Sequence, residues 1–178
     1  MSATTEESIP QARNLQTIVT VALSVHEGIE TAEEAAQAIH MVPRQGYYYL
    51  SAARFLGLVY REGKQNLPTD LGNKFAKATP EVRPGILSTL VTKAVDEAYE
   101  RIDEVTDQTI DYRLGTLISW SEQVESLGEP TISAELKDEI IKVKQARKQV
   151  IDTSTPALEG ELCLECFYRK SLTGECFC

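Results

Sequence analysis

Our expectation for the fold of this chain rests on residues 43–76, PRQGYYYLSAARFLGLVYREGKQNLPTDLGNKFA. Pro43 suits the first turn of a helix. Gly46, Leu50, Ala53 and Gly57 then recur at helical spacing on one side, and Gly57 stands where a helix commonly ends. The pattern therefore predicts a helix from residue 44 to 56 with one face in the core.

The other side of this helix is polar and aromatic. Its members are Arg44, Tyr48 and Ser51, with Gln45 and Tyr47 at the margins. Phe55 falls on the same side, although a phenylalanine does not fit a fully solvated face. We expect at least one of the consecutive tyrosines at 47–49 to belong to the core.

A small hairpin follows the helix. Residues 58–60 are strand formers, residues 62–64 form a turn around Gly63, and residues 66–67 return as a second strand. Thr69 then caps a helix over residues 70–78, with Asp70 in its first turn.

Two helices precede the quoted stretch. Apolar residues at helical spacing predict the first over residues 11–25, and Gly28 ends it. Thr31 and Glu34 form a capping box that opens a second helix of about nine residues. Three helices and a hairpin, followed by the helix over residues 70–78, therefore make up the first part of the chain.

The second half is predicted to be helical, over residues 85–102, 111–128 and 132–151. Ser133 is a plausible cap of the last helix, Trp120 is expected in the core, and residues 152–161 have the composition of a linker. We expect a mainly α (α+β) protein with three parts, at residues 11–80, 81–152 and 153–178. Five carboxylates are expected on a solvated helix face, namely Asp96, Glu97, Glu100, Asp103 and Glu104.

The net charge of −9 argues against indiscriminate nucleic-acid binding, but the charge is unevenly distributed. Residues 43–64 carry four cations against the single carboxylate of Glu62, namely Arg44, Arg54, Arg61 and Lys64. A second excess, read more simply as a solvated face, comprises Lys142, Lys144, Arg147 and Lys148. An acidic body with a basic patch would orient the approach of a phosphate backbone.

No stretch approaches the roughly 18 apolar residues that a membrane-spanning helix needs. The acidic N-terminus also lacks the basic and apolar segments of a signal peptide. We therefore expect a cytoplasmic protein that does not enter a membrane.

Residues 31–68 resemble the winged helix-turn-helix family. The short capped helix, the turn HMVP, the aromatic helix and the LGLV ribbon match its order, and the likeness extends over residues 14–78. LPTDLG resembles the phrase that follows the wing in that family, with Pro68 as an intrusion. The resemblance implies that the helix at 43–56 enters the major groove of double-stranded DNA.

The residue types at the start of this helix suit that role. Arg44 and Gln45 are the types that make paired hydrogen bonds to guanine and adenine. Tyr47, Tyr48 and Ser51 could reach phosphates or thymine methyl groups. Phosphate contacts are expected from three cations, two of them on the wing, namely Arg54, Arg61 and Lys64.

Two other functions stay open. Winged helices also serve as protein-interaction modules, and three tyrosines would suit an adaptor or a regulator equally well. An enzyme is the third alternative, although no convincing catalytic centre is present. The E-x-K spellings at 62–64 and 135–137 resemble part of a nuclease site, but the first lies on a turn and the second on an amphipathic helix.

A more particular resemblance combines the aromatic helix, the phrase YRLGTLISWSEQV and terminal cysteines. It is to the non-catalytic recognition regions of some bacterial restriction endonucleases and related defence proteins, in which winged-helix and zinc elements recognise DNA. The phrase carries Arg113, Thr116, Ser119 and Trp120. A homodimer, a catalytic domain elsewhere and a partner protein are all compatible with this reading.

All 4 cysteines lie in the last 16 residues, as Cys163, Cys166, Cys176 and Cys178. Four thiolates at this spacing can surround one Zn²⁺, which would supply the folding energy of so small an element. The last pair has one intervening residue instead of the usual two. Redox activity and unbound thiols are the alternatives, whereas disulfides do not suit a reducing compartment.

Overall fold

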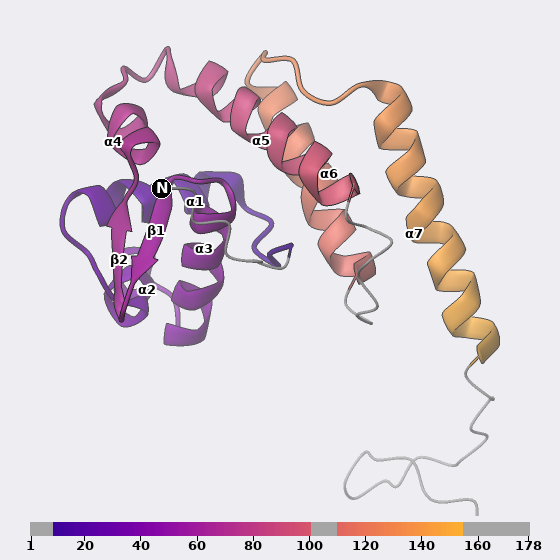
Figure 1. The fold of residues 1–178 in the computed structure, drawn as a ribbon, viewed down its shortest axis with the longest axis horizontal. Helices are drawn as coiled ribbons and strands as arrows, with labels where there is room; N and C mark the ends of the chain where they lie inside the picture. The colour runs from indigo at the N-terminus through magenta and orange to yellow at the C-terminus, as the bar shows by residue number, and fades with distance from the viewer. Residues whose placement is uncertain (1–8, 101–109, 155–178) are drawn as a thin grey trace, which may run out of the picture. The chain divides into compact units, whose positions relative to one another are not determined.

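A computed structural model describes the backbone of residues 9–100 and 110–154. These residues form helices and one antiparallel pair of strands (Figure 1), which confirms the mainly α class. The elements are α1 (Leu15–His26), α2 (Ala32–Ala38), α3 (Pro43–Phe55), β1 (Val59–Glu62), β2 (Gln65–Pro68), α4 (Asp70–Lys77), α5 (Arg83–Glu100), α6 (Ile110–Ser126) and α7 (Ala134–Ser154).

The chain divides into two compact units, at residues 1–144 and 145–178. The predicted boundary at residue 80 falls inside the first unit. Of the second unit, only the end of α7 is described. This helix continues to Ser154, and the rest of the linker predicted from residue 152 lies outside the described residues.

The first helix starts four residues later than predicted, because Asn14 caps it. The Asn14 side chain accepts a hydrogen bond from the backbone N–H of Thr17 at 3.0 Å. Residues 9–14 precede α1, and within them Ile9 and Ala12 are buried in the core. The apolar residues before Leu15 are therefore core residues without being helical.

Side chains of α6 fix this N-terminal segment. The indole N–H of Trp120 donates to the carbonyl of Ala12 at 2.9 Å. The Gln123 amide accepts from the N–H of Leu15 at 2.8 Å and donates to the carbonyl of Arg13 at 2.7 Å. The bond to Leu15 satisfies an N–H group that the start of α1 leaves without a helical partner, and the other two satisfy carbonyl groups of the segment before the helix.

The turn between α2 and α3 is a tight helix ending. The N–H of His40 donates to the carbonyl of Gln37 at 3.1 Å, and that of Met41 donates to Ala36 at 2.8 Å. This bond pair is a Schellman motif, which requires a left-handed residue. His40 occupies that position with a φ of 54°.

Gly46 sets how closely α3 approaches α2. A Cβ at this residue would lie 2.1 Å from the carbonyl oxygen of Ala32 and 2.8 Å from the backbone nitrogen of Ala36. Such distances are far inside van der Waals contact, so only glycine permits this crossing. Leu50 and Ala53 continue the same face of α3 into the core, as predicted.

The hairpin is longer and tighter than the sequence suggested. β1 and β2 pair antiparallel, from Val59 with Pro68 to Glu62 with Gln65, across a two-residue loop. Gly63 opens this loop with a φ of 60°, at the position where a two-residue hairpin turn needs glycine. Thr69 then caps α4 by accepting from the N–H of Gly72 at 2.9 Å, as predicted.

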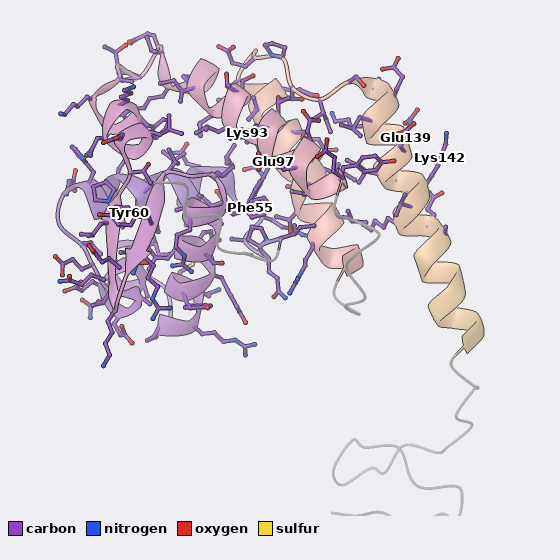
Figure 2. The ribbon with its side chains drawn as sticks, in the orientation of Figure 1. Phe55, Tyr60, Lys93, Glu97, Glu139 and Lys142 are labelled. Carbon is purple, nitrogen blue, oxygen red and sulfur yellow. The ribbon has the colours of Figure 1, made fainter. Side chains whose placement is uncertain are left out.

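The helices of the second half complete the core of the first unit. Trp120 is fully buried on α6, and the Phe55 ring packs against it with 6.2 Å between centroids. This contact explains why an aromatic residue occupies the outer side of α3. Phe55 is labelled in Figure 2. α5 and α6 lie side by side (Figure 1), with Leu87, Val91 and Val95 among the buried residues of α5.

Among the described residues, no helix combines the length and the apolar character needed to cross a membrane.

Candidate nucleic-acid interface

The first turns of α3 expose the residues expected to contact bases. Arg44 and Gln45 are exposed, and Tyr47 keeps 50% of its surface open. Ser51 is half-buried, and Tyr49 packs against the core, which accounts for one of the three tyrosines. The N-terminal half of α3 therefore presents a polar and aromatic side to solvent.

Four side chains form a continuous row along this side of α3. The Nε of Arg44 donates to the Tyr48 hydroxyl at 2.6 Å, and its guanidinium carbon lies 5.5 Å from the centre of the Tyr48 ring. The rings of Tyr48 and Tyr47 meet edge to face, with 6.4 Å between centroids. Arg54 completes the row, with its guanidinium carbon 5.8 Å from the Tyr47 ring. We call these four residues the α3 row.

Arg54 also ties the α3 row to the hairpin. Its Nη1 donates to the side-chain oxygen of Asn66 on β2 at 2.9 Å. Asn66 is only 6% exposed, and its side-chain amide donates to the carbonyl of Glu30 at 2.7 Å. The guanidinium that we expected on phosphate is thus engaged within the protein.

Asn66 is the residue that sequence reasoning missed. The sequence indicates only that Asn66 belongs to the returning strand. In the structure, its backbone N–H also donates to the carbonyl of Glu30 at 2.9 Å. One side chain therefore connects α3, β2 and the segment before α2. Asparagine is uncommon in strands, so its place inside a predicted strand is the signal that could have pointed to it.

The hairpin carries the remaining predicted contacts. Arg61 is exposed, and its Nε donates to the carbonyl of Gly63 at 3.0 Å, which holds the side chain against the loop. Lys64 is exposed on the loop itself. Tyr60 on β1 is 37% exposed and is labelled in Figure 2. The hairpin thus offers two cations and one aromatic ring to solvent.

Apolar side chains lie at the turn before α3. Met41 is 37% exposed and Val42 is 60% exposed, and they immediately precede the first turn of the helix. Sequence reasoning treated this turn only as a connection. Together with Tyr47, they give the start of α3 an apolar component beside its charges.

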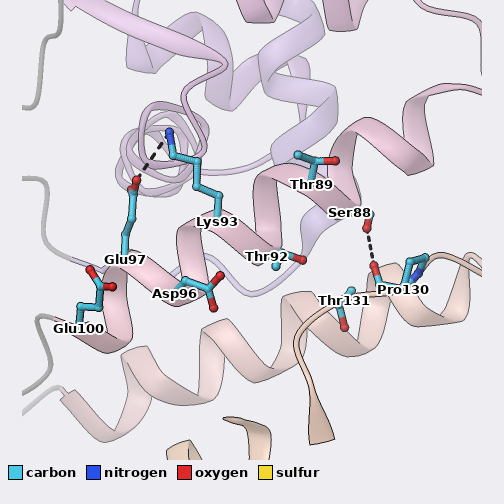
Figure 3. Close-up of a pocket in the computed structure, with 9 residues that line it drawn as sticks. All are labelled: Ser88, Thr89, Thr92, Lys93, Asp96, Glu97, Glu100, Pro130 and Thr131. Atoms are coloured by element: carbon cyan, nitrogen blue, oxygen red, sulfur yellow. Dashed lines mark hydrogen bonds and ion pairs between the residues drawn. The ribbon is translucent and has the colours of Figure 1, made fainter.

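A different depression lies on α5 and the loop before α7 (Figure 3). Its volume is about 470 Å³. Two of its lining residues, Lys93 and Glu97, form an ion pair at 3.6 Å between successive turns of α5. The lining residues are Ser88, Thr89, Thr92, Lys93, Asp96, Glu97, Glu100, Pro130 and Thr131. Asp96, Glu97 and Glu100 are exposed, as expected of a solvated face; Asp103 and Glu104 lie outside the described residues.

No metal centre is seen among the side chains that the structure describes, at residues 9–100 and 113–146. There, no group of three or more histidine, cysteine, aspartate or glutamate side chains could hold a metal ion. The four cysteines predicted to bind zinc lie outside these ranges. Of the second E-x-K spelling, Lys137 is engaged with Glu125, since its Nζ lies 2.7 Å from each carboxylate oxygen.

The second basic run is only partly visible. Lys142 is exposed and Lys144 is half-buried, whereas the side chains of Arg147 and Lys148 lie outside the described part of the chain.

Comparisons with known proteins give no further guide. No protein-family model, no curated protein and no solved structure matches this chain.

Proposed function

We propose that this protein binds double-stranded DNA with α3 in the major groove and the β1–β2 hairpin against the backbone. The order α1, α2, α3, β1, β2 supports a winged helix-turn-helix arrangement. A helix fits the width of the major groove, and residues near its N-terminus can then reach the base edges. In this reading, the protein is a DNA-recognition element of a defence or regulatory system.

One observation carries this proposal: Arg44 and Gln45 are exposed on the first turn of α3, while the opposite face of the same helix is buried. Arginine and glutamine are the side chains that make paired hydrogen bonds to guanine and adenine. Gly46 holds the buried face close to α2, so the exposed face has a defined direction.

The hairpin cations supply the electrostatic part. Arg61 and Lys64 are exposed near the loop, within a chain whose net charge is −9. Because the rest of the surface is repelled by phosphate, these cations would favour one docking orientation. Each phosphate contact releases counterions, so binding should weaken steeply with salt.

The test is a salt titration of binding to mixed-sequence duplex DNA by fluorescence anisotropy. The slope of log K against log salt should fall by about 0.9 when Arg61→Ala removes one phosphate contact. Arg44→Ala should weaken binding to a preferred site by about 1–3 kcal/mol.

Lys93→Ala is the matched control. It removes one exposed charge from α5, where the Lys93 side chain is 71% exposed and forms an ion pair with Glu97 at 3.6 Å. It should leave the slope unchanged. Absence of binding at low salt, or an equal effect of Lys93→Ala and Arg61→Ala, would refute the proposal.

An adaptor that binds another protein is the second candidate. The exposed Met41, Val42 and Tyr47 favour it, because apolar and aromatic side chains anchor protein interfaces. The two candidates separate in the salt titration, since an adaptor would show no duplex binding at low salt.

A further inference from the structure

The α3 row does more than expose an arginine, because it restrains the guanidinium of Arg44. The Nε of Arg44 donates to the Tyr48 hydroxyl at 2.6 Å, and the Tyr48 ring lies 5.5 Å from the guanidinium carbon. A free arginine side chain samples many rotamers, and ordering it on binding costs affinity. A hydrogen bond and a ring contact formed in advance reduce this cost.

The engagement of Nε also determines which donors remain. Within the described part of the chain, the two Nη groups of Arg44 form no hydrogen bond. These groups form the end of the planar fork, which matches the N7 and O6 acceptors of guanine. Tyr48 thus occupies the inner donor of Arg44 and leaves the outer pair available.

The far end of the row is anchored to the fold. Arg54 donates to the nearly buried Asn66 at 2.9 Å, and Asn66 donates to the carbonyl of Glu30 at 2.7 Å. Arg54 in turn lies 5.8 Å from the Tyr47 ring, which meets Tyr48 edge to face. The arrangement therefore extends from β2 to the first turn of α3.

We propose that Tyr48 is a positioning residue, which presents Arg44 to one guanine in the major groove, and that Arg54 anchors this arrangement instead of contacting phosphate. The inference rests on the proposed function. It assigns to the α3 site a specificity for duplexes with guanine at one defined position, and it gives Tyr48 a role other than contacting DNA.

The experiment begins with the full-length wild-type protein and a pool of randomised duplexes, from which the preferred duplex is selected. Affinity is then measured for this duplex and for copies in which each guanine in turn is replaced by 7-deazaguanine. That base pairs normally but lacks the N7 acceptor. We expect one replacement to weaken wild-type binding at least about fivefold.

The variants Tyr48→Phe, Arg44→Ala and the double variant are measured on the same duplexes. Tyr48→Phe should weaken binding to the preferred duplex about two- to tenfold. The reason is that the Arg44 side chain, no longer held by the hydroxyl, must be ordered on binding. In the Arg44→Ala background the same change should have no effect. On the duplex whose 7-deazaguanine weakens wild-type binding, Tyr48→Phe should reduce the affinity by a smaller factor than on the preferred duplex.

A matched control tests the loss of a tyrosine hydroxyl as such. Tyr99→Phe removes a hydroxyl that donates to Glu139 at 3.1 Å, on α5 and away from the row. It should leave all affinities unchanged, and circular dichroism should show all variants folded. Arg54→Gln removes the charge and should leave the salt slope unchanged, because no phosphate contact is lost. A fall in the slope of about 0.9 would show instead that Arg54 contacts phosphate.

The outcomes separate the two proposals. If the wild-type protein binds no duplex at low salt, the proposed function fails and this inference fails with it. If the protein binds DNA, but Tyr48→Phe is silent or weakens every duplex equally with or without Arg44, the positioning role is wrong while DNA binding stands. Loss of the Tyr48 effect in the Arg44→Ala background supports it.

Discussion

Replacing Gly46 by alanine should destabilise the protein because the added methyl group would meet backbone. The new Cβ would lie 2.1 Å from the Ala32 carbonyl oxygen, 2.8 Å from the Ala36 nitrogen and 2.9 Å from the Ala36 Cβ. Two of these atoms belong to the main chain of α2, so no side chain can rotate away. α2 and α3 would have to separate by about 1 Å to restore ordinary contact distances.

The magnitude follows from two opposing effects. Overpacking of this kind costs about 3 kcal/mol or more when backbone must shift. Alanine is better than glycine in a helix interior by about 1 kcal/mol, which offsets part of that cost. The net loss should be about 2 kcal/mol, which lowers the melting temperature by about 4–8 °C for a protein of this size.

Urea unfolding followed by circular dichroism measures this change, with Gly85→Ala as the matched control. Gly85 is also helical, on α5, but a Cβ there would lie 3.8 Å from its nearest neighbour, the Glu129 carboxylate. The control should be neutral or up to about 1 kcal/mol more stable. If Gly46→Ala is as stable as the control, the close approach of α2 and α3 is wrong.

Three further predictions concern single sites. His40→Gly should raise stability by up to about 1 kcal/mol in urea unfolding, because His40 has a φ of 54°, whereas His40→Val should lower it. Hydrogen bonds from Lys137 and then Thr131 lower the pKa of Glu125 from its ordinary value of 4.5. The ion pair of Glu125 with Lys137 therefore stabilises the fold above pH 4.5, and this stabilisation is lost as the pH falls through the lowered pKa. In Glu125→Gln, the melting temperature should consequently decrease less as the pH is lowered through this range. Metal analysis of protein purified without chelator should give about one zinc per chain if the four cysteines form a site, and a ratio near zero would exclude it.

Local signals in the sequence were sufficient to predict where several helices begin or end. The capping box of Thr31 and Glu34 forms as predicted, with Thr31 accepting from the Glu34 N–H at 3.2 Å. Pro43 opens α3, and Gly57 follows its end with a φ of 72°. Each of these features depends on residues within one helical turn, which is why a short pattern could predict them.

Features that depend on distant residues could not be predicted in this way. The place of Phe55 makes sense only with Trp120, and the attachment of the segment before α1 to α6 depends on the distant Trp120 and Gln123. At the candidate site, the exposure of Arg44 and Gln45 agrees with helical spacing. The engagement of Arg54 with Asn66 requires the hairpin to fold back onto α3, which no local pattern encodes.

The attachment of residues 9–14 to α6 has a practical consequence for dissecting this protein. A fragment covering residues 11–80 would lack the indole that receives Phe55 and the amide that secures the entry to α1. Such a piece would expose apolar surface and aggregate more readily than the intact chain. The two halves of the first unit are therefore not independent folding fragments, and any truncated form of the protein must retain α6.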